Sequence, residues 1–399
     1  MITSRLHPLC AVAASAALLL TGCSGGAADD KPAHPVFDVP VGQQPHQALL
    51  ATQAARSAAF TQTLTFSSPS GDTVQTTSGR LDFPGGRAVG SIDWAPAEKL
   101  PQQAQDTLLG TRLAGRAPTR TRLAVDPGTI RLRAGEARYW LLYEGNSGAI
   151  APGAAVDTLR GSEAAFGGTL LEVLSAAEDV KEAPAKKGGR VYRAELSQTY
   201  ALRLFPKDLG SELAISMDAN GDVPFVPLSI SVDAKGRVLR AEADLSALLA
   251  RKDSALKGMT GLRARLDLTG FGVSAPVMPA ASEPALDAKK AVTKVAKVKK
   301  GGCADLATGT RTFGMVVSLP CEQPHDIRVF GHARFDATYP GKDAAKRMAG
   351  EACDDAHDAA PSAWTREAVR KGHFTYTWPR AGGWGAGSDP VITCYVKTR

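Results

Sequence analysis

The placement of the cysteines constrains this 399-residue chain more than any other feature of its sequence. Two of the six lie near the start, at Cys10 and Cys23, and the other four lie between residues 303 and 399. The long middle part has none, so it must fold by burying apolar side chains without covalent cross-links. A content of 44% hydrophobic and 22% charged residues is enough for packed cores, and the length predicts about two domains.

Residues 1–22 have the pattern of an export signal. Arg5 supplies a positive charge, and the uncharged run Leu9–Leu20 is too short to span a hydrocarbon core of about 30 Å. The run ends in Leu20-Thr21-Gly22-Cys23, which resembles the lipobox of bacterial lipoproteins. The resemblance implies that Cys23 begins the mature protein and carries a thioether-linked diacylglycerol, with acyl chains such as palmitate, at the extracellular face of the cell membrane. The alternative is a plain secretory signal followed by an incidental cysteine.

The composition of residues 23–44 predicts a flexible tether. The apolar pattern of residues 45–280 predicts an opening helix followed by an antiparallel sheet. Apolar and polar side chains alternate from Phe60 to Ser67, and turn-forming residues occur at 68–72 and at Asp126-Pro127-Gly128. A second helix is predicted at Leu170–Ala177. Hairpin connections with few helices favour the α+β class, with a curved antiparallel sheet and helices on one side.

Three segments of this middle part resemble the LppX/LprG-type lipoproteins: Thr77–Leu81, Leu228–Val238 and Leu266–Val273. The resemblance implies a LolA-like half-barrel whose apolar interior holds acyl chains of lipids or lipoglycans in some members. The candidate residues for lining such a pocket are Leu64, Phe66, Ile92, Trp94, Tyr139, Leu141, Leu228 and Ile230. Sequence does not distinguish a cavity from a filled core, and most positions of this kind are core.

Residues 281–302 are predicted to be a Pro- and Lys-rich linker. Six lysines between Lys289 and Lys300, together with Arg5, account for the whole formal net charge of +7. The remaining sequence is therefore balanced, which argues against a nucleic-acid partner. We favour a solvated spacer, and the alternative is a contact with anionic phospholipid or wall polymer.

Residues 303–399 predict a small α+β domain that needs reinforcement, and in an exported chain disulfides are favoured over zinc. Four cysteines allow three pairings, and the sequence does not choose among them. We favour Cys303 with Cys321, which closes a strand-turn-strand segment, and Cys353 with Cys394, which ties a helix to the last strand.

The same region resembles the septum-formation domain of actinobacterial envelope proteins. The elements that carry the resemblance, in chain order, are Cys303, the segment Cys321–Val329 with its Pro324-His325-Asp326, the turn Tyr339-Pro340-Gly341, Cys353, Trp384, Gly387 and Cys394. The resemblance implies a link to septum or cell-wall processes and no assigned reaction.

His325 and Asp326, with His332 and Asp336 nearby, carry groups that general-base and metal sites use. The alternative is that His325 caps a turn or bonds a backbone carbonyl beside the disulfide, while Asp326 faces solvent. We favour this alternative because the sequence has no HExxH, no evident third ligand and no G-x-S-x-G motif. The glycine pattern at 383–387 lacks the strand-to-helix context of a phosphate loop. We therefore expect no metal, no cofactor and no enzymatic activity.

Together these features predict a lipid-anchored envelope lipoprotein that binds or carries an acyl lipid at the outer face of the membrane, with a C-terminal module near cell-wall or division proteins. The alternative is a non-catalytic protein-binding adaptor whose half-barrel is solid.

Overall fold

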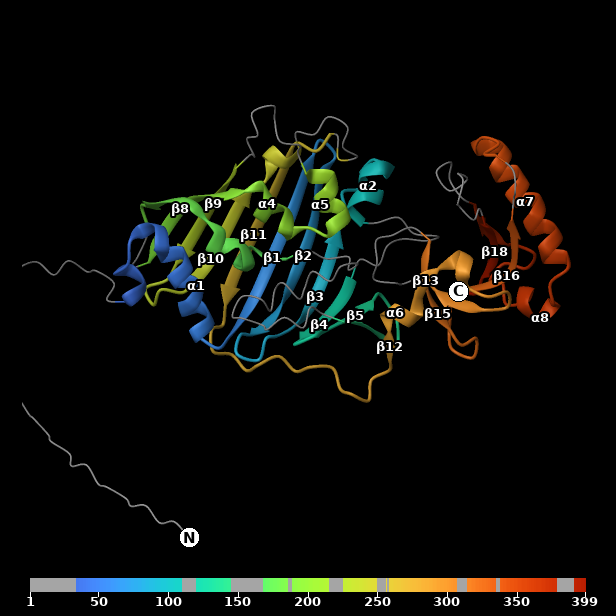
Figure 1. The fold of residues 1–399 in the computed structure, drawn as a ribbon, viewed down its shortest axis with the longest axis horizontal. Helices are drawn as coiled ribbons and strands as arrows, with labels where there is room; N and C mark the ends of the chain where they lie inside the picture. Colours follow the sequence, from blue (N-terminus) through green and yellow to red (C-terminus); the bar gives the residue numbers. More distant parts are fainter. Residues whose placement is uncertain are drawn as a thin grey trace, which may run out of the picture. The chain divides into compact units, whose positions relative to one another are not determined.

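The computed structural model describes residues 34–109, 120–144, 168–185, 189–214, 225–249, 256, 258–306, 314–334, 338–378 and 391–399, which all belong to one compact unit of the chain, Pro32–Arg399. Most of them form two β-sheets with helices packed against them, so the fold is α+β as predicted (Figure 1). No helix within these ranges is both long and apolar enough to cross a membrane.

The larger sheet has 12 strands in the order β12-β6-β5-β4-β3-β2-β1-β11-β10-β9-β8-β7, and every pairing is antiparallel except that of β12 with β6. Its strands are β1 (Ser57–Ser68), β2 (Gly71–Asp82), β3 (Arg87–Ala95), β4 (Arg120–Asp126), β5 (Thr129–Ala134), β6 (Trp140–Glu144), β7 (Glu178–Ala183), β8 (Arg190–Ser197), β9 (Phe225–Val232), β10 (Val238–Asp244), β11 (Gly261–Thr269) and β12 (Ala285–Asp287). The hairpins predicted at 68–72 and at Asp126-Pro127-Gly128 join β1 to β2 and β4 to β5.

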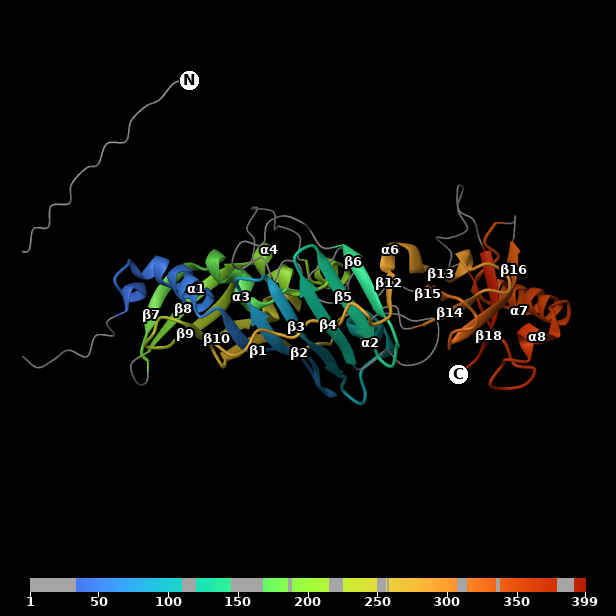
Figure 2. The same cartoon turned by 90° about the horizontal axis from the view of Figure 1, so that it is seen from below.

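Helices cover one face of this sheet, as Figures 1 and 2 show. They are α1 (Gln44–Ala54), α2 (Gln102–Leu109), α3 (Leu170–Val173), α4 (Gln198–Ala201) and α5 (Lys207–Leu213). Their buried side chains join those of the strands in a single apolar cluster. The predicted helix at Leu170–Ala177 is one turn of α-helix followed by a 3-10 turn at Leu174–Ala176.

Buried polar side chains fix two of these helices on the sheet. In α1, the Gln44 Oε1 accepts a hydrogen bond from the Tyr192 hydroxyl at 2.7 Å, and the Thr52 Oγ1 accepts one from the Val238 N–H at 2.8 Å. The Gln62 amide of β1 donates to the Gly168 carbonyl at 3.0 Å and accepts from the Leu170 N–H at 2.7 Å. Gln62 therefore satisfies a free N–H at the start of α3, which is buried.

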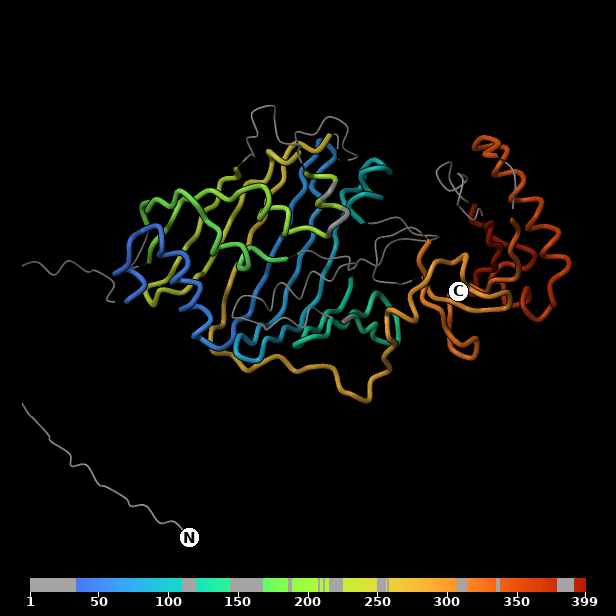
Figure 3. The backbone as a smooth tube through the Cα atoms, viewed as in Figure 1, coloured from blue at the N-terminus to red at the C-terminus, as the bar shows by residue number. Residues whose placement is uncertain are grey.

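A long connection leads from β11 to β12 along the ends of the strands, which the tube in Figure 3 makes clear. The Gly272 N–H donates to the Ser57 carbonyl at 3.0 Å, and Arg131 donates to the Pro279 carbonyl at 3.4 Å. The connection thus crosses from the centre of the sheet to its far edge, where β12 adds beside β6 in parallel.

The smaller sheet has the order β13-β15-β14-β16-β18-β17. Its strands are β13 (Val292–Lys294), β14 (Cys303–Asp305), β15 (Met315–Leu319), β16 (Ile327–Arg334), β17 (Thr375–Thr377) and β18 (Val391–Lys397), and its helices are α6 (Ala288–Ala291), α7 (Lys342–Asp358) and α8 (Ser362–Thr365). Helix α7 packs its buried Ala349 and Cys353 on β16 and β18.

Two disulfides cross-link the smaller sheet, as expected. Cys303 is joined to Cys321, and Cys353 to Cys394, which is the pairing that we favour from the sequence. The first links β14 to the turn after β15, and the second links α7 to β18.

The lysine-rich segment 289–300 differs from the solvated spacer that we expected. It forms most of α6, all of β13 and the 3-10 helix η7 (Val295–Lys297), and β13 pairs with β15. Val295 and Val298 are buried in the smaller sheet's core, while all six lysines are exposed. The valines are spaced too sparsely to predict a helix. They nevertheless anchor the segment, because β13 adds an edge strand to the smaller sheet and Val295 and Val298 are buried in its core.

Replacing Gln62 with Met should destabilise the protein by about 1–3 kcal/mol, because a side chain of similar size leaves the Leu170 N–H and the Gly168 carbonyl without their buried partner. Urea unfolding measures the change, and Thr61→Met, on the exposed face of the same strand, is the control. A change within about 0.5 kcal/mol for Gln62→Met, typical of surface substitutions, would contradict this role.

Candidate functional site

The strand register places all eight predicted lining residues on one face of the larger sheet. Leu64 of β1 aligns through Gln75 of β2 with Trp94 of β3, and Leu132 of β5 aligns with Leu141 of β6. Because side chains alternate between the two faces, the shared register puts the other candidates on the same face as these. This is the face that the helices cover.

The eight residues nevertheless lie in two different environments. Leu64, Phe66, Ile92, Leu228 and Ile230 are buried in the main apolar cluster, and Trp94 packs against it half-buried. Tyr139 and Leu141 instead belong to a cluster with Val317 and Leu319 of the smaller sheet and Ala288 of α6. Tyr139 and Leu141 therefore lie apart from the other six candidates, at the β6 end of the face, where α6 and β15 cover them.

The least covered stretch of the apolar face lies over β2 and β3. We name it the β2–β3 patch and define it as Thr77, Gly79, Gly90, Ile92 and Trp94, of which only Ile92 is fully buried. Gly79 and Gly90 align with one another across the two strands. A Cβ on Gly90 would lie 2.1 Å from the Ser78 carbonyl oxygen, so these positions exclude side chains and leave bare backbone on the face.

A buried amide lies directly beside the β2–β3 patch. Gln75 precedes Thr77 on the same face of β2 and aligns with Trp94. Its side chain is 3% exposed, and its Oε1 has no hydrogen-bond partner within the described part of the chain. Buried acceptors are normally paired, so this enclosed oxygen would gain a hydrogen bond from any donor group that displaced the side chains around it.

A network of charged and polar groups joins the end of the larger sheet to the smaller one. The Tyr139 hydroxyl donates to the Asp305 Oδ2 at 2.9 Å, and the Arg399 Nη2 lies 2.7 Å from the Asp305 Oδ1. Arg399 also pairs with Asp326 at 2.5 Å. We name these four residues the junction network. Asp326, which we expected to face solvent, instead holds Arg399 and accepts the Leu306 N–H at 2.8 Å.

Burial dominates the electrostatics of the junction network. The Asp305 side chain is 2% exposed. Burial and the nearby Asp326 carboxylate raise the pKa of Asp305, against the attraction of Arg399. Burial and the Asp305 carboxylate also raise the pKa of Tyr139, which keeps its hydroxyl protonated as the hydrogen-bond donor.

Arg399→Ala should destabilise the protein by about 3 kcal/mol, because it leaves the Asp305 carboxylate buried beside Asp326 without its cation. Guanidinium unfolding at neutral pH measures the loss. The control is Lys397→Ala, which removes an exposed cation from the end of β18. Equal, small effects of the two substitutions would show that the junction network carries no stability.

A second polar contact fixes the entry to β12. The Glu283 Oε2 accepts from the Trp140 Nε1 at 2.9 Å and from the Arg133 Nη1 at 3.0 Å, while its Oε1 accepts from the Ala280 N–H at 3.2 Å. The Trp140 hydrogen bond is the largest influence that lowers the pKa of Glu283, and Arg133 also contributes. Arg133 lies over the Trp140 ring as well, with its Cζ 4.6 Å from the ring centroid.

The stabilisation from Glu283 should depend on pH. Because the pKa of Glu283 is lowered in the folded state, its contribution is present above the usual glutamate pKa and is lost as the pH falls through the folded-state pKa. Glu283→Gln should therefore destabilise the protein at neutral pH and have a shrinking effect in acid. Urea unfolding across this range measures the difference, with the exposed Glu98→Gln as control. A difference that stays constant with pH would refute the assignment.

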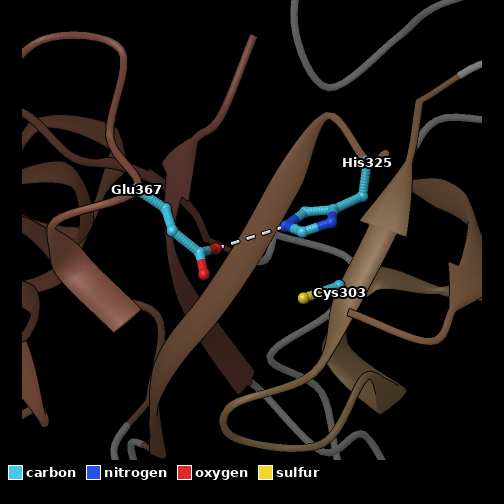
Figure 4. A group of neighbouring side chains, drawn as sticks. All are labelled: Cys303, His325 and Glu367. Carbon is cyan, nitrogen blue, oxygen red and sulfur yellow. Dashed lines mark hydrogen bonds and ion pairs between the residues drawn. The ribbon is translucent and has the colours of Figure 1, made fainter. Parts of the chain in front are cut away.

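His325 lies against the Cys303–Cys321 disulfide. Its Nδ1 is 2.8 Å from the Gln323 carbonyl oxygen, as the non-catalytic interpretation predicts. Its Nε2 is 3.3 Å from the Glu367 Oε2, and the Cys303 Sγ lies near both (Figure 4). His332 is engaged elsewhere, with its Nε2 2.7 Å from the Val298 carbonyl oxygen. No local motif reveals Glu367, which is 42 residues from His325 in sequence and follows α8.

Three sequence predictions lie outside the described residues: Cys23 with its lipobox, Asp336, and the glycine pattern 383–387. Sequence analysis also missed Asp305 and Arg399 of the junction network. A buried aspartate in a three-residue strand carries no signal of its own, because burial of a charged side chain is decided by distant partners.

The sequence matches no protein-family profile and no curated protein. Among solved structures, the fold is similar to the Mycobacterium tuberculosis lipoprotein LppX, with 11% identity and a TM-score of 0.32 over 58% of this chain and 95% of that one. It is also similar to the Pseudomonas aeruginosa MucA/MucB complex, with 10% identity and a TM-score of 0.24 over 89% and 93% of the two chains. A third is a proposed outer membrane lipoprotein-sorting domain of Vibrio parahaemolyticus, with 11% identity and a TM-score of 0.18 over 58% and 95%. With TM-scores this far below 0.5, no function carries over from these proteins to this chain.

Proposed function

We propose that this chain is a non-catalytic, lipid-anchored protein of the cell envelope that binds an acyl lipid at the β2–β3 patch. The observation that carries the proposal is the contrast along one sheet face. Most of the face is closed by helices or by the smaller sheet, whereas the β2–β3 patch combines half-buried side chains with bare glycine backbone and lies beside the buried, unpaired amide oxygen of Gln75.

The chemistry of the β2–β3 patch suits an acyl chain with a hydroxyl or amide near one end. The half-buried Trp94 ring, backed by the buried Ile92, offers apolar surface, which favours a methylene chain by about 0.8 kcal/mol per buried CH₂. The Gln75 Oε1 accepts a hydrogen bond from the polar group. Ligand sites of this kind are mostly apolar, with a few polar groups that fix orientation.

The lipid anchor belongs to the same proposal. The lipobox ending at Cys23 supports attachment to the outer face of the cell membrane, and two acyl chains suffice for stable anchoring. The resemblance of residues 303–399 to a septum-formation domain supports a place near cell-wall or division proteins. A Cys23→Ser variant should appear in the culture medium, and its retention on membranes would contradict the anchor.

Thr77→Trp should reduce lipid binding by about tenfold or more, equivalent to about 1.4 kcal/mol, because the ring fills the β2–β3 patch. Native mass spectrometry of protein purified from its own membranes measures the bound lipid. The matched control is Thr76→Trp, which places the same ring on the opposite face of β2.

Wild-type protein and Thr76→Trp should carry a co-purified acyl lipid, and Thr77→Trp should carry little. Absence of lipid from wild type would contradict the proposal and favour an adaptor with a solid half-barrel. Equal loading of both variants would place the lipid elsewhere.

A further inference from the structure

The Cys303–Cys321 disulfide has a histidine and a carboxylate directed at it. Ligand atoms of Cys303, His325 and Glu367 all lie within 4.8 Å of one another (Figure 4). Cys321, bonded to Cys303, supplies a second sulfur next to this group, although it is not one of the three residues whose ligand atoms are mutually within 4.8 Å. We propose that reduction of this disulfide converts the group into a Zn²⁺ site with Cys303, Cys321, His325 and Glu367 as its four ligands.

The imidazole is already oriented as in metal-binding histidines. Its Nδ1 lies 2.8 Å from the Gln323 carbonyl oxygen, so the Nδ1 carries the proton and donates it to that carbonyl. Zinc would bind through the lone pair of Nε2, the nitrogen that faces Glu367, and would displace the proton that Nε2 donates to the Glu367 carboxylate. A backbone carbonyl that fixes the tautomer in this way is the usual outer partner of a histidine that binds zinc.

The carboxylate is oriented too. Glu367 presents its Oε2 to His325, while its Oε1 pairs with the Arg328 guanidinium. Arg328 is held in turn by the Gly301 carbonyl at 3.2 Å. One carboxylate oxygen therefore remains for a metal when the Arg328 pair is kept.

The charges of the proposed site balance. Two thiolates and one carboxylate contribute −3, Zn²⁺ contributes +2, and the neutral imidazole contributes nothing. The guanidinium of Arg328, bonded to the same carboxylate, supplies the missing positive charge. Thiolate, imidazole and carboxylate ligands in a closed set of four are characteristic of structural zinc sites.

Backbone pairing keeps the ligands in place without the disulfide. Cys303 lies in β14, which pairs with both β15 and β16. The His325 carbonyl accepts a hydrogen bond from the Thr398 hydroxyl. Two residues beyond Glu367, the Val369 N–H donates to the Lys397 carbonyl at 2.9 Å. Three of the four ligands, Cys303, His325 and Glu367, are therefore held by contacts that do not depend on the S–S bond.

The Cys303–Cys321 bond is also the accessible one of the two disulfides. Cys321 is half-buried, whereas Cys353 and Cys394 are both completely buried. A thiolate of a dithiol reductant would attack the Cys321 sulfur. This attack breaks the S–S bond and releases Cys303 as a thiolate. The reductant's second thiol would then displace Cys321, so that the reductant becomes a cyclic disulfide and both electrons reside on the protein sulfurs. Zn²⁺ displaces any proton that remains on the two thiols.

The experiment compares the oxidised full-length protein with protein reduced by dithiothreitol under native conditions and desalted anaerobically. Co²⁺ and Zn²⁺ are added separately to each. The reduced protein should bind one metal ion per chain, with a thiolate-to-cobalt charge-transfer band and the visible bands of tetrahedral Co²⁺, and the oxidised protein should bind none.

Loss of a residue that only hydrogen-bonds a metal ligand typically weakens metal binding about 10–100-fold. His325→Ala and Glu367→Gln each remove a ligand, so each should weaken binding by more than this. His332→Ala is the matched control, since this histidine bonds the Val298 carbonyl outside the group. Cys353→Ala combined with Cys394→Ala should retain the metal, whereas Cys303→Ser combined with Cys321→Ser should not.

Circular dichroism shows which variants are folded. If His325→Ala is unfolded, the test rests on Glu367→Gln, because the Glu367 side chain is 37% exposed. Absence of the charge-transfer band from reduced wild type would overturn the proposal. Wild-type affinity in Glu367→Gln or in His325→Ala, or binding that requires Cys353 and Cys394, would also overturn it.

Discussion

The larger sheet of 12 strands is stable only when one of its faces is buried. No disulfide crosses that sheet, so its stability rests on covering a continuous row of apolar side chains. Helices α1 to α5 pack into the main apolar cluster on this face, and α6 with β15 covers the end at β6. Between the strands that these elements bury, the β2–β3 patch stays half-buried. A ligand can contact only side chains that are incompletely buried, as those of the β2–β3 patch are.

Packing of the smaller sheet against β6 costs electrostatic free energy, and the junction network offsets this cost. Packing the smaller sheet there buries Asp305, and a lone buried carboxylate is expensive. Arg399 and the Tyr139 hydroxyl supply the positive charge and the donor that it needs. The lysine-rich segment ties the sheets further, because β12 pairs with β6 and β13 pairs with β15.

Sequence was a good guide where structure is local and a poor one where it depends on distant partners. The hairpins around residues 69 and 127 follow from alternation and turn residues, and the face of Leu64 and Ile92 follows from a period of two. The parallel addition of β12 after a crossing connection has no local signal, and neither has the meeting of His325 with Glu367. The lysine run looked solvated because its charge outweighs Val295 and Val298, yet those two valines decide its fold.

Contact quenching of Trp94 fluorescence shows whether an acyl chain reaches the β2–β3 patch, as we propose. Bromine quenches indole fluorescence only at close range, so a fatty acid brominated along its chain reports whether the chain reaches the ring. We expect saturable quenching in the wild-type protein that is lost in Trp94→Phe, and we expect an unbrominated chain of equal length to compete for the site. Quenching of equal size in the two proteins, or none in either, would contradict it.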